Sequence, residues 1–153
     1  MTQELDLWIQ GASRPARSGE RFENINPATG AVISRVARAR AEDVDDAVAA
    51  AKAALPAWRA TSADERASLL EAIADGIEAD LEGFAEAESR DTGKPISLAR
   101  NIDISRAIAN LRFFAGAVRH DETGCHRMAQ AINYTLRKPL GVVGLITPWN
   151  LPL

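Results

Sequence analysis

The sequence predicts an α/β fold in which short strands come first, three helices follow, and a parallel sheet begins near the C-terminus. Three observations support this prediction. Apolar residues alternate with polar ones near the N-terminus, they recur at helical spacing in the middle, and they form an almost continuous run over residues 142–146. Such a run is typical of a strand buried on both faces, with helices above and below the sheet.

Short strands are expected in the first 36 residues. One precedes Gly11, where apolar residues take every second position: Leu5, Leu7 and Ile9. Residues 21–36 predict two further strands joined by a turn over residues 26–30. Pro27 fixes φ for that turn and Gly30 allows a positive φ.

The first helix is expected to begin at Glu42 and Asp43, because acidic residues are favoured in the first helical turn. We expect it to end near Pro56, which lacks the N–H group of a helical hydrogen bond. One helical face collects the apolar residues Val44, Ala47, Val48, Ala51 and Leu55.

Two more helices are expected after the first. Ser62 and Glu65 have the spacing of a capping box, and residues 92–95, Thr-Gly-Lys-Pro, end the second helix. Its apolar face consists of Leu70, Ile73, Ile77, Leu81 and Phe84. The third helix begins near Ile96, with an apolar face of Ile104, Ile108, Leu111, Ala115 and Val118.

The C-terminal part predicts two strands of different kinds. A loop at Gly124 precedes an alternating stretch, residues 132–137, which indicates a strand with one face in water or at an interface. After Pro139, residues 142–146 predict the buried strand. A parallel strand needs neighbours joined through crossovers. Because no crossover follows residue 146, we expect the chain to be the front part of a larger protein.

Composition excludes several function classes. The 153 residues suffice for one domain, and a net charge of −3 with no basic stripe argues against nucleic acid or an acidic membrane as partner. No apolar run could span a bilayer, and the N-terminus does not resemble a secretory signal. A single cysteine cannot form an internal disulfide. These features together favour the cytoplasm.

Cysteine and histidine offer little chemistry. Cys125 has His126 beside it and His120 nearby, which are the side chains of a nucleophile and a base. Adjacent residues of a strand point in opposite directions, however, so a structural thiol is favoured. Two histidines and one cysteine so placed give no metal-ligand spacing. Gly141 and Gly144 do not form a dinucleotide-binding fingerprint.

Asn150 is placed differently, just beyond the predicted buried strand. In open α/β sheets ligands bind beyond the carboxyl ends of the strands. A carboxamide there could stabilise an oxyanion through its N–H donors. Position alone favours the alternative, a turn-forming Asn before Leu151 and Pro152. Asp91, between a helix and Gly93, is by itself interpreted as a solvated or capping acid.

Residues 139–153, PLGVVGLITPWNLPL, closely resemble the segment of aldehyde dehydrogenases that enters the cofactor site. Residues 24–58 and 65–78 resemble the N-terminal hairpin and first helices of that family, and residues 89–99 resemble its Asp-x-Gly-Lys-Pro junction. The resemblance covers nearly the whole chain in the family's order. Within the family it is greatest to the hydroxymuconic and aminomuconic semialdehyde dehydrogenases, on residues 97–120 and 132–153.

The resemblance implies a Rossmann-like cofactor domain, a catalytic domain and a bridging oligomerisation hairpin. Residues 1–128 would be the first part of the NAD(P)-binding domain and residues 129–140 the oligomerisation strand or hairpin. Residues 141–153 would be the first core strand and the segment that enters the cofactor site, with the catalytic domain absent. A homo-oligomer, dimer or tetramer, is implied for the full-length protein.

The resemblance also implies a chemistry. In the family a Cys thiolate attacks an aldehyde, hydride passes to NAD or NADP, and water releases a carboxylic acid. Asn150 would hold the oxyanion, and NAD is the favoured cofactor. The cofactor would lie against Ile146, Thr147, Pro148, Trp149 and Asn150. A monovalent cation, Na⁺ or K⁺, would bind Asn24, the Ile25 carbonyl and Asp91.

One departure from the family decides the expected activity. The family's nucleophilic Cys and general-base Glu come far downstream of the Pro-Trp-Asn motif, and this chain contains neither, since Cys125 lies upstream of it. We therefore expect the chain alone to be inactive. The longer enzyme would oxidise a small aldehyde, a muconic semialdehyde of aromatic-compound breakdown. The alternatives are a non-catalytic association module of the same ancestry and, remotely, a Cys125 hydrolase.

Overall fold

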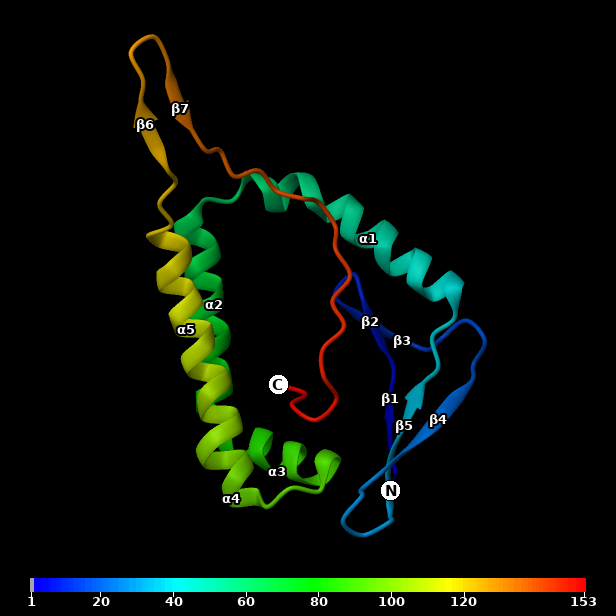
Figure 1. The fold of residues 1–153 in the computed structure, drawn as a ribbon. Helices are drawn as coiled ribbons and strands as arrows, with labels where there is room; N and C mark the ends of the chain where they lie inside the picture. The colour runs from blue at the N-terminus through cyan, green and yellow to red at the C-terminus, as the bar shows by residue number, and fades with distance from the viewer. Residues whose placement is uncertain (1) are drawn as a thin grey trace.

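A three-stranded mixed sheet at one end of the molecule is built by the N-terminal strands (Figure 1). The computed structural model describes residues 2–153. Strand β5 (Val32–Ala37) lies in the centre, parallel to β1 (Gln3–Leu5) and antiparallel to β4 (Arg21–Ile25). The turn between β4 and β5 is as predicted, since Gly30 has φ +72° and its N–H donates to the Asn26 carbonyl at 2.8 Å.

The single strand predicted before Gly11 is wrong, because the structure divides it in two. Strand β2 (Leu7–Ile9) leaves the sheet and pairs with β3 (Ala12–Arg14) in a separate hairpin. The hairpin turn has φ +57° at Gln10 and φ +75° at Gly11, as a tight two-residue hairpin turn requires. Asp6, at the break between β1 and β2, forms an ion pair with Arg21 of β4. The β2–β3 pairing and the Asp6–Arg21 ion pair both need partner residues outside the predicted strand.

Helix α1 (Ala41–Ala60) continues through Pro56, so the predicted end of the first helix is wrong. Pro56 leaves the carbonyl four residues earlier, that of Lys52, without its helical donor. Both residues are exposed, and water can therefore satisfy that carbonyl. The start is as predicted, and one Asp43 carboxylate accepts from the backbone N–H groups of Arg40 at 2.8 Å and Arg17 at 2.9 Å.

The second predicted helix is two helices in the structure, α2 (Ala63–Ala79) and α3 (Leu81–Thr92), with a break at Asp80. Its start is confirmed: Ser62 Oγ accepts from the Glu65 N–H at 3.1 Å, and Glu65 accepts from the Ser62 N–H at 2.6 Å. The end of α3 is also as predicted, because Gly93 has φ +75° and closes the helix. The break at Asp80 allows α3 to turn away from the direction of α2 (Figure 1).

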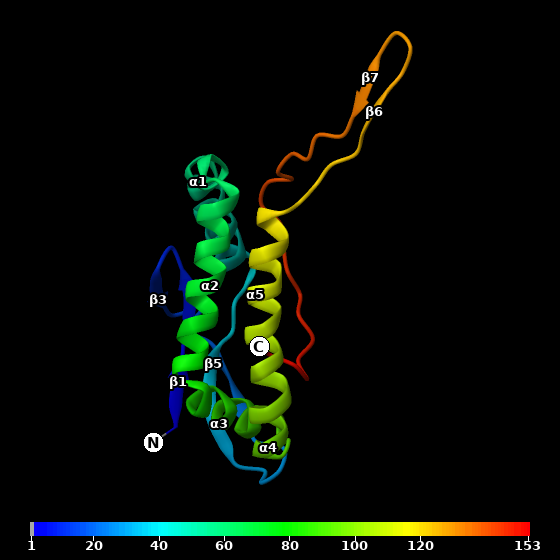
Figure 2. The ribbon, with the colours of Figure 1, turned by 90° about the vertical axis from the view of Figure 1, so that its left-hand side faces the viewer.

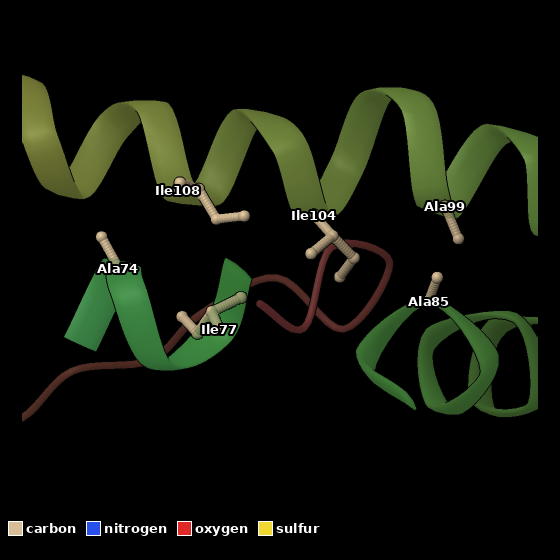
Figure 3. Packing of buried hydrophobic residues seen from close by; sticks show 6 residues of the cluster. All are labelled: Ala74, Ile77, Ala85, Ala99, Ile104 and Ile108. Atoms are coloured by element: carbon tan, nitrogen blue, oxygen red, sulfur yellow. The ribbon is translucent and has the colours of Figure 1, made fainter. Parts of the chain in front are cut away.

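The third predicted helix is continuous but irregular. It consists of α4 (Ile96–Leu98), a π-helical segment η1 (Ala99–Ile104) and α5 (Ser105–Arg119). Helix α5 runs alongside α2 in both views (Figures 1 and 2). Between these helices and α3 lies the buried core, in which Ala99 faces Ala85 and Ile108 lies near Ala74 (Figure 3). Ile104, at the centre, is fully buried.

A short hairpin, β6 (Cys125–Arg127) with β7 (Ile132–Tyr134), projects away from the helices (Figures 1 and 2). Strand β7 ends at Tyr134, three residues earlier than the alternating pattern predicted. The hairpin makes its own backbone pairs, and all its residues are exposed. Alternation therefore identified the strand but could not set its length, which the short partner strand determines.

The predicted buried strand over residues 142–146 is not formed. Residues 141–147 run as an extended segment that ends in a turn over residues 148–151, and in the described part of the chain no strand pairs with residues 141–153 (Figure 1). Leu145 is 84% exposed and Ile146 is fully exposed. A parallel strand takes every ladder hydrogen bond from its neighbours, and residues 2–153 contain no such neighbour. No described helix is long and apolar enough to cross a membrane.

Candidate functional site

Asn150 lies in a turn at the end of the extended C-terminal segment. The turn covers residues 148–151, and the Leu151 N–H donates to the Pro148 carbonyl at 3.4 Å. The Asn150 carbonyl accepts from Lys94 Nζ at 3.2 Å, while the residue itself is exposed. The turn predicted from position alone is therefore present. It fixes the backbone of Asn150 and leaves the residue open to solvent.

The segment before Asn150 carries exposed apolar side chains. Ile146 is fully exposed and Trp149 is 87% exposed. Exposed apolar side chains suit contact with an aromatic ring, and the polar groups of Thr147, which is also exposed, can hydrogen-bond to substituents on such a ring. These features fit one end of a nicotinamide cofactor. No glycine-rich phosphate loop adjoins them, so this segment offers no cradle for the diphosphate.

The turn is linked through Lys94 to a partly buried ion cluster that the sequence did not predict. Lys94 Nζ donates to Glu88 Oε1 at 2.7 Å and to Asp103 Oδ2 at 2.6 Å. The three side chains are only 13%, 4% and 12% exposed, in the order Lys94, Glu88 and Asp103. Burial lowers the pKa of Lys94, but hydrogen bonds and charges from Asp103 and Glu88 outweigh it and raise that pKa overall. Lys94 is therefore charged at neutral pH.

The chain builds this cluster where α3 ends. Glu88 lies in the last turn of α3, and its carbonyl accepts from Thr92 Oγ1 at 2.7 Å. Ser89 Oγ donates to the Lys94 carbonyl at 2.7 Å, which folds the backbone back toward the helix. Gly93 must be glycine here, because a Cβ would lie 2.7 Å from Pro27 Cγ and φ is +75°. The Thr-Gly-Lys-Pro stretch thus ends a helix and also places an ammonium group.

The structure brings together two of the three residues predicted to hold a cation. Asn24 Nδ2 donates to Asp91 Oδ1 at 2.6 Å, joining β4 to α3. Asp91 is therefore a partly buried tertiary contact, and its interpretation as only a solvated or capping acid is wrong. The strand register shifts between Asn24 and Ile25, which places a backbone irregularity beside the pair.

The oxygen atoms of Asn24, the Ile25 carbonyl and Asp91 are the kind of ligand that a hard monovalent cation prefers. The Asp91 carboxylate is present, and rotating the Asn24 amide by half a turn would replace its N–H with an oxygen. In the arrangement observed, however, Asn24 and Asp91 satisfy each other. Within residues 2–153 no group of three or more His, Cys, Asp or Glu side chains could hold a metal ion.

A cavity of about 320 Å³ adjoins both the ion cluster and the Asn24–Asp91 pair. It lies between the sheet and α3, and Pro152 and Leu153 of the C-terminal segment form part of its wall. Ser34 of β5 also lines it, and its buried Oγ has no hydrogen-bond partner in the described residues. The remaining wall consists of Gln3, Leu5, Asn24, Ile33, Phe84, Ala87, Glu88, Arg90, Asp91 and Ile104.

Cys125 lies far from this region, on the projecting hairpin (Figure 1). It is exposed, and it pairs with Tyr134 in the ladder while His126 pairs with Asn133. Adjacent strand residues point to opposite faces, so His126 is not aligned with the thiol. The geometry gives Cys125 neither a base nor an oxyanion donor.

Comparison with known proteins identifies the family of the chain. Residues 14–153 match the sequence model of the aldehyde dehydrogenase family. The chain belongs to the aldehyde dehydrogenase family. Among curated aldehyde dehydrogenases, it is 48% identical to 2-hydroxymuconic semialdehyde dehydrogenase of Pseudomonas sp. (strain CF600), over 99% of this chain and 32% of that protein. It is 50% identical to 2-aminomuconic semialdehyde dehydrogenase of Danio rerio, over 97% of this chain and 31% of that protein.

Solved aldehyde dehydrogenases share the fold. An NAD⁺ complex of aldehyde dehydrogenase from Bacillus cereus superposes with a TM-score of 0.92 at 38% identity, over 98% of this chain and 31% of that one. The α/β architecture expected from the resemblance is therefore confirmed. The chain spans about a third of the length of the aldehyde dehydrogenases that it matches.

Proposed function

We propose that this chain is the N-terminal portion of an NAD(P)-dependent aldehyde dehydrogenase that oxidises an aldehyde to a carboxylic acid. The observation that carries the proposal is the turn over residues 148–151, which holds Asn150 by its backbone and leaves the residue exposed. Family membership over residues 14–153 supports it. The catalytic thiol and base would belong to sequence beyond these 153 residues.

Asn150 would act as an oxyanion donor. When a nucleophile adds to an aldehyde, the carbonyl oxygen gains nearly a full negative charge. A neutral carboxamide can donate an N–H to that oxygen without a change of protonation state. The exposed position of Asn150 suits this role, because a substrate bound from solvent could reach its side chain.

Ile146, Thr147, Pro148 and Trp149 would lie against the nicotinamide and ribose of the cofactor. Bound NAD(P)⁺ supplies the hydride acceptor of the reaction. The exposed side chains of Ile146 and Trp149 would exclude water from the reacting face. NAD is favoured over NADP, and the NAD⁺ complex of the Bacillus cereus relative supports that choice.

We propose a muconic semialdehyde as substrate, in the breakdown of aromatic compounds, because two curated relatives at 48% and 50% identity carry names of that kind. The longer enzyme would be a cytoplasmic dimer or tetramer, joined through residues 129–140, which carry strand β7 of the projecting hairpin. Residues 1–128 and 141–153 would belong to its NAD(P)-binding domain. Asn24, Ile25 and Asp91 would hold a structural Na⁺ or K⁺ with no part in the chemistry.

Sequencing beyond the Leu153 codon, followed by expression of the continuous reading frame, tests the proposal. A continuing frame that encodes a Cys-containing catalytic domain should yield a protein that forms reduced nicotinamide from 2-hydroxymuconic semialdehyde. Parallel assays with NAD⁺ and NADP⁺ decide the cofactor. A stop codon there, together with stable expression of the 153 residues, would contradict it. That result would support a non-catalytic association module, for which the exposed apolar residues of the hairpin, Met128, Ile132 and Tyr134, provide a surface.

A further inference from the structure

Lys94 connects three separate parts of the chain. An ammonium group has three N–H donors and no acceptor. In this structure they serve Glu88 of α3, Asp103 of the π-helical segment η1, and the backbone carbonyl of Asn150. The three distances are 2.7, 2.6 and 3.2 Å. Every donor of Lys94 is therefore used, and the third is directed at the C-terminal turn.

The two carboxylates fix the position of the ammonium group. Glu88 is 4% exposed and Asp103 is 12% exposed, so neither can exchange Lys94 for water without leaving a buried charge unpaired. Asp103 lies in η1, a helical form that is rare and often occurs at functional sites. The two carboxylates thus hold the Lys94 ammonium group in place for its third hydrogen bond.

The turn has few other attachments. Within residues 2–153, the bond from Lys94 is the one side-chain hydrogen bond that reaches residues 141–153. Its acceptor is 56 residues away in the chain. Pro152 and Leu153 follow the turn and line the cavity beside Phe84, Glu88 and Ile104. The turn is therefore held by one hydrogen bond at Asn150 and by apolar contact immediately afterwards.

We propose that Lys94 is a positioning residue for Asn150. Its ammonium group, fixed by Glu88 and Asp103, holds the carbonyl of Asn150 and so sets the direction in which the Asn150 carboxamide points. The effect of Lys94 on catalysis rests on the oxyanion role proposed above for Asn150. The hydrogen bond from Lys94 to the Asn150 carbonyl does not depend on that role. Misplacing a catalytic group by about 1 Å can cost a hundredfold in rate, so one backbone hydrogen bond at this position has a large effect.

The attachment is tested in the 153-residue chain by the mobility of Trp149, which adjoins Asn150, at a dilution where light scattering detects no association. Replacing the other two tryptophans, Trp8→Phe and Trp58→Phe, leaves Trp149 as the single fluorophore. Lys94→Met keeps the apolar stem and removes the donors. The fraction of fluorescence anisotropy lost within about one nanosecond should then rise at least twofold, because loop motions fall on that timescale.

Two further variants separate attachment from general stability. The triple variant Lys94→Met, Glu88→Gln and Asp103→Asn removes the unpaired carboxylates that the single change leaves buried, and it should show the same rise. Arg100→Met is the matched control, since Arg100 also joins η1 to α3, through Glu82 at 2.6 Å, without touching the turn. It should behave as the parent. A folded triple variant with unchanged Trp149 mobility would overturn the proposal, and so would a triple variant that does not fold.

In the longer enzyme the positioning role is read from kinetics. The triple variant should lower kcat roughly ten- to a hundredfold with KM nearly unchanged, while Arg100→Met should leave both unchanged. Equal kinetics in the triple variant and Arg100→Met would overturn the positioning role. An unmodified longer protein that forms no reduced nicotinamide would instead refute the proposed function, and the anisotropy measurement would still decide the attachment.

Discussion

Asn150 has two separable roles, one for its backbone and one for its side chain. Its carbonyl is bonded to Lys94, and the proposed chemistry uses the carboxamide. A substitution of the side chain therefore leaves the attachment of the turn in place. This separation makes Asn150 a direct test of the proposed oxyanion site.

In the longer enzyme, Asn150→Ala should lower kcat by roughly a hundred- to a thousandfold, the usual size for one lost oxyanion donor. The ground-state carbonyl carries little charge and the tetrahedral adduct carries nearly a full one, so KM should change far less. Single-turnover formation of reduced cofactor is the appropriate measurement, because it avoids a slow product-release step.

Asn150→Asp should be at least as harmful, since an anion would face the developing oxyanion. This variant is nearly the same size as the parent and retains the backbone acceptor for Lys94. Near-normal single-turnover rates in both variants would leave Asn150 as a turn residue only.

Among the elements, the start of α1 depends on one buried carboxylate. Asp43 is 4% exposed and accepts from two backbone N–H groups, one of which belongs to Arg17 in a distant loop. Hydrogen bonds from the Arg40 and then the Arg17 backbone lower the pKa of Asp43. Asp43 thus both caps α1 and attaches the preceding loop to it.

Asp43→Ala should lower the Tm at pH 7 by roughly 2–4 °C, the size expected for one lost helix cap in a chain of this length. A carboxyl whose folded pKa is depressed stabilises the fold above its unfolded pKa of about 3.9. That contribution disappears as pH falls through the lower folded value. The Tm difference between variant and parent should therefore shrink progressively as the pH falls below that unfolded pKa.

Asp45→Ala is the control for this prediction, because Asp45 lies in the same helical turn and is exposed. Thermal melts followed by circular dichroism at several pH values make the comparison. A Tm loss for Asp43→Ala that is equal at pH 7 and pH 2.5, or equal to that of Asp45→Ala, would contradict the capping role.

The C-terminal segment is the second element with a testable consequence. Its apolar side chains are exposed, with Leu145 at 84% and Trp149 at 87%, and its backbone has no strand partner in the described residues. Unpaired apolar strands promote association. The 153-residue chain should therefore self-associate, and a version cut after Lys138 should do so much less. Light scattering at matched concentrations compares them. A monomeric 153-residue chain with a sharp thermal transition would refute this expectation.

At the scale of the whole molecule, the cysteine and the proposed oxyanion donor lie in different parts of the structure. The one cysteine lies on the projecting hairpin, away from the Asn150 turn (Figure 1). A nucleophile must be within hydrogen-bonding reach of the group that activates it. Among residues 2–153, the one cysteine is therefore not adjacent to Asn150, the proposed oxyanion donor.

We therefore expect the 153-residue chain to oxidise no aldehyde. Purified chain with NAD⁺ or NADP⁺ and a panel of aldehydes should show no rise in the absorbance of reduced nicotinamide. Cys125→Ser serves as the control. Turnover by the parent that is lost in this variant would show that the thiol is catalytic and would overturn this expectation.

The sequence by itself determined the features that depend on neighbouring residues. The turn over residues 26–30, the Ser62 capping box and the end of α3 at Gly93 are all present as predicted, because their contacts span only a few positions. The Pro-Trp-Asn motif likewise indicated the family. Short-range geometry and a specific motif are both readable without the fold.

Only the tertiary structure decided the features whose partners are distant in the chain. The Lys94 cluster joins residues up to 56 positions apart, and no local pattern marks such a contact. The strand predicted over residues 142–146 has the right composition but no neighbour to supply its hydrogen bonds. A strand forms only when its backbone donors and acceptors are paired by another segment. The sequence of residues 142–146 therefore sets a strand propensity, and the rest of the molecule decides whether the strand forms.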